Sequence, residues 1–214
     1  MKKNALWIAV VILIALLLIT YILTHSSRPI IYPVFTVNGY ILIRNYCDAV
    51  PNGYVFLDYM TFNTTRMEYS TDAGSLYVTN DKRWATNSDF NQYGIVMGRQ
   101  TLHGKCMFSL LVSHVQNQIG GNVVGIATST FHPLVARFGL NVGEGKDSIG
   151  IYENGTIKCN GINVSTGPLF NDTNQVDVAI DNNRQLMWYR VDRGAWNGDP
   201  ETGTGGVSYA QLKN

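Results

Sequence analysis

The stretch SIGIYENGTIKCNGINVS, residues 148–165, indicates the fold class more clearly than any other part of the chain. It contains two Asn-Gly pairs, at residues 154–155 and 160–161, each flanked by short runs of alternating apolar and polar residues. Asn-Gly is the preferred pair for the two-residue type I′ turn, because both central residues need a positive φ. Alternation with a period of two is the pattern of a half-buried β-strand. We therefore predict a three-stranded antiparallel meander over Ser148–Ser165.

Short apolar runs separated by turn signals continue along most of the chain outside this meander. Further turns are predicted at 38–39, 52–53, 120–121 and 181–183, where Asn, Asp and Gly cluster. Many short strands at this spacing are typical of an antiparallel sandwich or barrel, so we predict an all-β domain. The predicted strands are Tyr40–Ile43, Tyr54–Leu57, Ser75–Val78, Gly94–Met97, Cys106–Val112, Val123–Thr128, Ser148–Tyr152, Thr156–Cys159, Gln175–Asp181 and Gln185–Val191.

Residues Ala5–Leu23, ALWIAVVILIALLLITYIL, are a different kind of segment, with nineteen residues and no charge. A helix rises about 1.5 Å per residue, so a helix of this length reaches close to the roughly 30 Å of a bilayer core. We therefore predict a single transmembrane α-helix over residues 5–24, after a short N-terminal tail at 1–4. A linker over 25–36 and a β domain over 37–214 complete the predicted domain organisation.

Two other interpretations of the apolar segment stay open. A secretory signal has a hydrophobic region of about 7–15 residues and a small-x-small cleavage site, and residues 24–29 offer no such site. A buried helix of a globular domain would show a polar face, and none interrupts the run. Lys2 and Lys3 outweigh Arg28, which favours a cytoplasmic or interior N-terminus with the C-terminal domain on the opposite side. The predicted location is therefore a membrane that the chain crosses once, with lipid contact through Ala5–Leu23.

The charge composition of the chain limits which classes of partner the β domain can bind. The chain has a formal net charge of +1, and 14% of its residues are charged. A nucleic-acid surface needs clustered Lys and Arg, and no block of five like charges occurs. We therefore predict no nucleic-acid partner.

The three cysteines, Cys47, Cys106 and Cys159, cannot all pair within one chain. Cys106 and Cys159 alternate with apolar residues, which favours buried thiols on the core face of strands. One disulfide with one free thiol is the alternative that the sequence leaves open. No Cys-x-x-Cys motif occurs, so we predict neither a zinc site nor a redox site.

Five short motifs follow one another along the second half of the chain. They are GKCMF at 104–108, GIAT at 125–128, SIGIY at 148–152, VDVAID at 176–181 and LMWYR at 186–190. Their sequences and their order resemble the strands of SPRY (B30.2-like) domains, in which the last two form a signature hairpin. The resemblance covers roughly residues 60–210.

The tail of this region, with NGDP at 197–200 and TGTGG at 202–206, resembles SPRY-like domains of phages and large DNA viruses. There are departures from the family pattern in the loops and strands. Cys106 replaces the usual aromatic residue, Gln175 stands where Gly is common, and residues 191–194 lengthen a turn usually written Asn-Gly. The resemblance implies a concanavalin-like sandwich of two antiparallel sheets, a non-enzymatic module that binds proteins through loops at one end.

The chain shows no motif that carries catalytic or metal chemistry. Its histidines are His25, His103, His114 and His132. None has another His, a Cys or a carboxylate at metal-ligand spacing, and no Gly-x-Ser-x-Gly motif occurs. Asp177 and Asp181 lie about 13 Å apart on a predicted strand, farther than the carboxyl pair of a glycosidase. No calcium-loop pattern supports a site at Asp172, Asp177 and Asp199. We therefore predict no catalytic residue, no metal site and no cofactor.

Two predicted loops, Asn80–Gln92 and Thr128–Asp147, hold aromatic and basic residues among polar ones. Aromatic residues and Arg in loops are typical anchors of protein interfaces. The alternative is that these side chains fold back and cap the ends of the sandwich, since most large aromatic residues are substantially buried. The candidate partner-binding residues are Arg83, Trp84, Phe90, Phe131, His132 and Arg137.

Four Asn-x-Ser/Thr patterns predict N-glycosylation sites. Their acceptor residues are Asn63, Asn154, Asn163 and Asn171. Chance matches are the alternative, because the pattern is short and the chain is rich in Asn, Ser and Thr. Asn154 also begins a predicted Asn-Gly turn, which is a structural reason for its presence.

These observations predict a membrane-anchored, non-enzymatic protein-interaction module. The viral character of the tail favours a structural protein of a large DNA virus, which would link a virion membrane to capsid proteins or to a host protein. A carbohydrate-binding surface protein is the alternative, since lectins share the two-sheet architecture. A glucanase-type hydrolase is a third interpretation, against which the missing carboxylate cluster counts.

Overall fold

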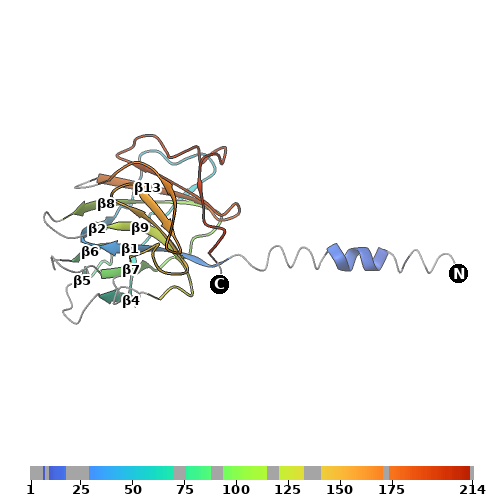
Figure 1. Cartoon of the computed structure of the whole chain (residues 1–214), viewed down its shortest axis with the longest axis horizontal. Helices are drawn as coiled ribbons and strands as arrows, with labels where there is room; N and C mark the ends of the chain where they lie inside the picture. The colour runs from blue at the N-terminus through green and yellow to red at the C-terminus, as the bar shows by residue number, and fades with distance from the viewer. Residues whose placement is uncertain are drawn as a thin grey trace.

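Alternating apolar residues form short strands, nearly all antiparallel, in two sheets that pack face to face (Figure 1). The computed structural model describes residues 7, 10–17, 29–69, 76–87, 94–114, 121–132, 141–170 and 174–212. The predicted all-β domain is therefore observed, and of the two predicted architectures, sandwich or barrel, the structure is a sandwich.

The first sheet, sheet A, has seven strands in the order β12-β11-β10-β9-β1-β7-β4. Its central strand, β1, pairs with β9 on one side and with β7 on the other. The strands are β12 (Ile162–Thr166), β11 (Thr156–Cys159), β10 (Ser148–Tyr152), β9 (Val123–Thr128), β1 (Ile31–Val37), β7 (Gly94–Gly98) and β4 (Phe62–Tyr69).

The second sheet, sheet B, has the strand order β15-β14-β13-β8-β2-β6-β5, and β3 pairs beside β8 in parallel. The long strand β8 lies at the centre of sheet B and pairs with β13 on one side and with β2 on the other. The strands are β15 (Val207–Ser208), β14 (Leu186–Val191), β13 (Asn174–Asp181), β8 (Lys105–His114), β2 (Gly39–Ile43), β6 (Trp84–Asn87), β5 (Leu76–Val78) and β3 (Val55–Phe56).

The chain passes from one sheet to the other at Asn38-Gly39, between β1 and β2. Gly39 has φ of 130°, a conformation that favours glycine because it has no Cβ. The Asn38 backbone N–H donates to Asn122 Oδ1 over 2.8 Å, which ties the crossing to the start of β9. The predicted turn at 38–39 is therefore the corner of the sandwich.

The core between the sheets is built from one face of most strands; β3 and β12 contribute no residue to it. Phe35 of β1 lies in it, with its ring centroid 5.6 Å from that of Phe62 and 6.2 Å from that of Phe108. Both contacts are edge-to-face, the geometry that aromatic pairs prefer. Cys106 and Cys159 are free thiols buried in this core, and Cys47 is also free, so the disulfide alternative is not observed.

The predicted meander is observed as β10, β11 and β12, with a register irregularity at Ile157/Lys158. Four strands, β1, β4, β6 and β15, were not predicted, and β1 lies where the sequence looked like a linker. The predicted linker over 25–36 contains most of β1, so the sandwich begins at Ile31 rather than at residue 37.

The transmembrane helix predicted over residues 5–24 is wrong. Helical residues are described at 7 and at 10–17, and the latter rise only about 12 Å, far less than a bilayer core. Among the residues that the structure describes, no helix is long and apolar enough to span a membrane. The single-pass membrane location depended on this helix and is corrected with it.

Candidate binding site

The outer face of sheet B carries a buried ion pair. Val176, Val178 and Tyr189 point into the core, so the alternate residues Asp177 and Arg190 point outward. These two residues are directly opposite each other on β13 and β14. Arg190 Nε donates to Asp177 Oδ2 over 2.8 Å, and the side chains are 9% and 0% exposed.

Further hydrogen bonds satisfy this pair, as a buried charge requires. Gln175 Nε2 donates to the other Asp177 oxygen over 2.9 Å, and Arg190 Nη2 donates to the Ala49 carbonyl over 2.8 Å. Arg44 Nη1 donates to Gln175 Oε1. The network therefore holds the segment 44–51 against the sheet.

A second loop, residues 195–206, lies over the same face. Trp196 stacks on the Arg190 guanidinium, with 4.6 Å from Cζ to the ring centroid. Trp188 Nε1 donates to the Thr204 carbonyl over 2.9 Å. A Cβ at Gly206 would lie 2.5 Å from Trp188 Cε2, so only glycine lets the loop approach this closely.

The turn at residues 199–204 is ordered by the Asp199 carboxylate. It accepts hydrogen bonds from the Glu201 N–H over 2.9 Å and from Thr202 Oγ1 over 2.8 Å. The Thr202 hydroxyl is the main cause that lowers the pKa of Asp199 below its ordinary value. The carboxylate is therefore ionised at neutral pH and fixed in position.

Three hydrogen bonds join the two loops. Asn52 donates to Glu201 through its backbone N–H over 2.8 Å and through Nδ2 over 3.0 Å. The Tyr54 hydroxyl donates to the Pro200 carbonyl over 3.1 Å, and burial raises the pKa of Tyr54 to about 12. The relative position of the loops is therefore set by contacts within the chain.

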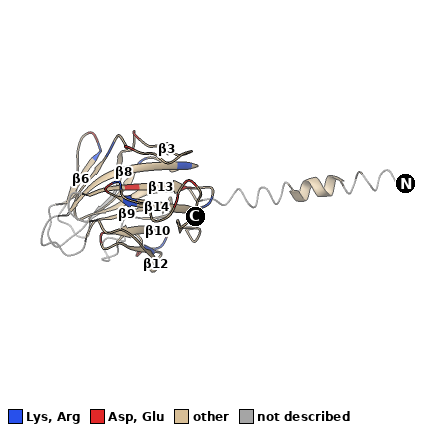
Figure 2. Ribbon diagram, turned by 90° about the horizontal axis from the view of Figure 1, so that it is seen from above, with Lys and Arg blue, Asp and Glu red and all other residues tan. Residues whose placement is uncertain are grey.

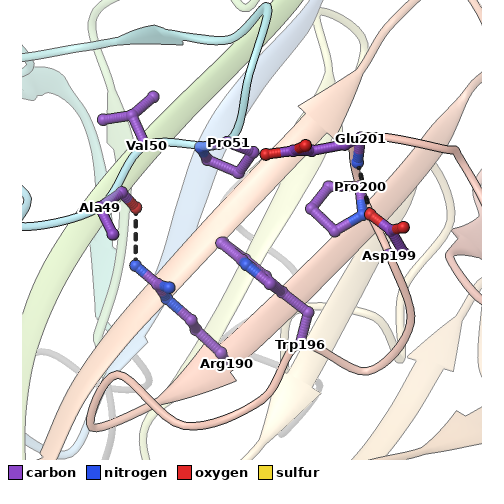
Figure 3. A pocket seen from close by; sticks show the side chains of 8 residues that line it. All are labelled: Ala49, Val50, Pro51, Arg190, Trp196, Asp199, Pro200 and Glu201. Atoms are coloured by element: carbon purple, nitrogen blue, oxygen red, sulfur yellow. Dashed lines mark hydrogen bonds between the residues drawn. The ribbon is translucent and has the colours of Figure 1, made fainter.

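A hollow of about 180 Å³ lies between the loops (Figure 3). We call it the Trp196 hollow. Figure 3 shows Trp196 between Arg190 on one side and Pro200 on the other. Its lining residues are Ala49, Val50, Pro51, Arg190, Trp196, Asp199, Pro200 and Glu201.

The chemistry of the Trp196 hollow is that of recognition. Its walls combine apolar residues with the charged residues Arg190, Asp199 and Glu201, and these charged groups are held by hydrogen bonds. Cys47 lies beside it, 3.8 Å from Arg190 Nη2, and burial raises the pKa of its thiol, so the reactive thiolate is disfavoured. Within the described part of the chain, no three His, Cys, Asp or Glu side chains form a metal-binding group.

The two aspartates that the sequence analysis judged too far apart for a carboxyl pair, Asp177 and Asp181, have separate partners. Asp177 pairs with Arg190, whereas Asp181 accepts hydrogen bonds from the backbone N–H groups of residues 183 and 184. Arg184 Nε lies 3.7 Å from Asp181 Oδ2. Each carboxylate therefore has a local structural role.

The candidate residues of the first predicted loop lie at the start of β6 and just before it. Trp84 is 36% exposed and stacks on Tyr40, with 5.0 Å between ring centroids. Arg83 Nη2 donates to the Ile43 carbonyl over 2.9 Å. Both side chains therefore pack along β2 instead of projecting from a loop.

The candidate residues of the second predicted loop differ from each other in burial. Phe131 is 2% exposed and belongs to an apolar cluster on the outer face of sheet A, whereas His132 is exposed. Phe90 and Arg137 lie outside the described residues. None of the described candidates lines the Trp196 hollow, which is formed by residues that were not predicted to bind a partner.

Three of the four sequon asparagines lie in described positions. Asn154 and Asn163 are exposed, in the β10–β11 turn and on the edge strand β12. Asn63 is half-buried, and its Oδ1 accepts from Thr65 N over 3.1 Å and from Thr65 Oγ1 over 2.7 Å. Asn171 lies outside the described residues.

One sequence signal points to the Trp196 hollow in retrospect. Residues 196–200, WNGDP, place an aromatic residue within a turn sequence, where a large apolar side chain is unusual. No local sequence pattern marks Arg190 as part of this site. Its partner Asp177 is thirteen residues away in the chain and is identified only by the pairing of β13 with β14.

No protein-family model, curated protein or solved structure matches the chain. The resemblance to SPRY domains therefore stays a prediction that rests on the quoted motifs, and so do the viral origin and the capsid or host partner.

Proposed function

We propose that this β-sandwich is a protein-interaction module that binds one side chain of a partner protein in the Trp196 hollow. The observation that carries the proposal is a hollow lined by Trp196, two prolines and charged side chains, whose two loops are already joined by hydrogen bonds. Binding to a preformed hollow costs little ordering of the loops, which favours affinity.

The volume of the hollow supports a side chain as its ligand. Pockets for drug-sized molecules and cofactors enclose about 300–1,000 Å³, and the Trp196 hollow encloses about 180 Å³. Anchor residues of protein interfaces fill small, well-packed pockets of this kind, and Trp and Arg are enriched among residues that carry binding energy.

The charges of the hollow favour a basic anchor. Asp177 balances the charge of Arg190. The remaining charged side chains of the lining, Asp199 and Glu201, therefore give the hollow a net negative charge. The apolar stem of a Lys or Arg would pack along Pro51 and Pro200, while its cation approaches the two carboxylates. We therefore propose a protein segment with an exposed Lys or Arg as the partner.

The test is selection of peptides from a random displayed library on the full chain, followed by fluorescence polarisation with the selected peptides. We expect selected peptides to share a Lys or Arg whose replacement by Ala abolishes binding. Trp196→Ala should weaken binding about thirtyfold, as expected for loss of a hot-spot residue worth roughly 2 kcal/mol. Trp84→Ala removes another partly exposed Trp and serves as the matched control, with unchanged affinity.

A second variant tests the charge of the anchor. Glu201→Gln keeps an acceptor for Asn52 but removes the negative charge, so we expect about tenfold weaker binding of basic peptides. Peptides that bind wild type and Trp196→Ala equally would refute the site. Binding on a glycan array, with no peptide selected, would support the carbohydrate-binding alternative instead.

A further inference from the structure

A second hollow, of about 320 Å³, lies where the edges of the two sheets meet. Edge strand β4 of sheet A forms one side, and the turn between β5 and β6 of sheet B forms the other. We call it the bulge hollow. Its lining residues are Phe62, Asn63, Thr64, Thr65, Lys82 and Arg99.

A β-bulge shapes one wall of the bulge hollow. The register of β4 against β7 shifts between Asn63 and Met67, so residues 64–66 leave the regular ladder. Asn63 Oδ1 holds the bulge by accepting from Thr65 N and Thr65 Oγ1. The side chains of Asn63, Thr64 and Thr65 therefore form a polar rim.

Backbone hydrogen bonds bring two cations to this rim. The Phe62 N–H donates to the Lys82 carbonyl over 2.7 Å, and the Arg99 N–H donates to the Thr61 carbonyl over 2.8 Å. Lys82 has φ of 58°, a left-handed conformation that is uncommon for a residue with a Cβ. Such strained residues persist where the surrounding structure holds them, and they cluster at binding sites.

The charge of the bulge hollow is not balanced by a carboxylate in its lining. Asp81, next to Lys82 in the chain, accepts from the Thr79 hydroxyl and the Arg83 N–H within its own turn. Among the described ion pairs, none involves Lys82 or Arg99. Lys82 and Arg99 therefore line the hollow without an anionic partner from the described chain.

We infer that the bulge hollow binds an oxyanion, the phosphate or sulfate group of a monoester. Arg and Lys form charge-assisted hydrogen bonds with such oxygens, and the Asn and Thr side chains add neutral donors. The volume of about 320 Å³ exceeds what the Trp196 hollow offers and leaves room for the group that carries the anion. This site is separate from the Trp196 hollow, with no lining residue in common.

The test is a titration of the full chain at constant ionic strength, with chloride as the balancing anion. The probes are inorganic phosphate, inorganic sulfate, phenyl phosphate and acetate, and the readout is the backbone amide shift of Thr64, Thr65 and Lys82 by NMR. We expect saturable shifts with phosphate, sulfate and phenyl phosphate, and only a weak linear response with acetate.

Two variants remove one cation each. Lys82→Asn is chosen because Asn accepts a positive φ, and Arg99→Gln keeps a polar side chain. We expect each to weaken phosphate binding about tenfold and the double variant to abolish saturation. Lys146→Gln, which removes an exposed cation elsewhere, is the matched control and should change the affinity less than twofold.

Three outcomes would overturn the inference. The first is a non-saturable response of wild type to all the anions, and the second is unchanged affinity in the double variant while its amide spectrum stays folded. The third is acetate binding as tightly as phosphate, which would exclude phosphate and sulfate as the preferred class. Tighter binding of phenyl phosphate than of inorganic phosphate would identify a monoester rather than the free ion as the ligand.

Discussion

Part of the outer face of each sheet is buried, but different chemistry covers the two buried parts. On sheet A the layer is apolar, with Val34 and Met97 from the strands packed with Phe131 from a loop. On sheet B an apolar cluster around Trp188 continues into the Arg190–Asp177 ion pair. An apolar layer stabilises the folded state in proportion to the apolar area that it buries, whereas a buried ion pair adds little net stability to the fold.

The two layers differ in what they contribute to a binding surface. The sheet A layer has one role, which is packing. The sheet B layer fixes two loops through directional bonds, from Arg190 to Ala49 and from Tyr54 to Pro200, and so creates the Trp196 hollow. Lys and Arg are otherwise scattered over the sandwich rather than gathered in one band (Figure 2).

The largest loss of stability is expected when the ion pair of sheet B is broken. Asp177→Ala leaves Arg190 buried without a carboxylate, so we expect a loss of roughly 3–5 kcal/mol in the free energy of unfolding. Urea unfolding followed by Trp fluorescence measures it. The double variant Asp177→Ala, Arg190→Met should recover most of the loss, since it removes both charges. A single variant as stable as wild type would show that this pair is not desolvated.

A smaller loss of stability is expected when a side chain is removed from the apolar layer of sheet A. Phe131 is 2% exposed, so Phe131→Ala should cost about 3 kcal/mol of stability by leaving a cavity. Because this layer lies on the other sheet, we expect the folded variant to bind peptides at the Trp196 hollow as wild type does. Phe131→Leu is the matched control, with a cost of about 1 kcal/mol. Reduced peptide affinity in the folded Phe131→Ala variant would show that the two faces are coupled.

The smallest effect concerns the acidic turn of the Trp196 hollow. The pKa of Asp199 lies below its ordinary value of 3.8, so its contribution to the turn is fully present above that pH and is lost as the pH falls through the lowered pKa. Thr202→Val removes the hydroxyl donor, and we expect the pKa of Asp199 to rise toward 3.8. Carboxyl NMR titration measures this shift. Thr166→Val, on the edge strand β12, should leave the Asp199 pKa unchanged.

Local turn chemistry was the most reliable guide to the fold. The Asn-Gly pairs of the meander predicted two hairpins, and β10, β11 and β12 confirm them. The pair at 38–39 was identified as a turn, but its role as the corner between the sheets was not. A turn depends on the φ of a few residues, whereas a corner depends on which sheet each strand joins.

Two predictions made from local patterns differ from the structure. Pro29 and Pro33 suggested a linker, yet Pro33 lies within the central strand β1, opposite Ile126 of β9. Proline is unusual in a central strand, since it cannot donate to the ladder. The apolar run at Ala5–Leu23 predicted a membrane-spanning helix from composition and length alone, and the described helical residues at 7 and 10–17 are too short to form one.

The sequence by itself determined that the chain forms an all-β domain of short strands, because strand alternation and Asn-Gly turns are local properties of neighbouring residues. Only the tertiary structure decided where a binding surface lies. The contact between Asn52 and Glu201 joins residues 149 positions apart, and Arg190 finds Asp177 through strand register. The energy of such contacts depends on distance in space and on burial, neither of which a local pattern contains.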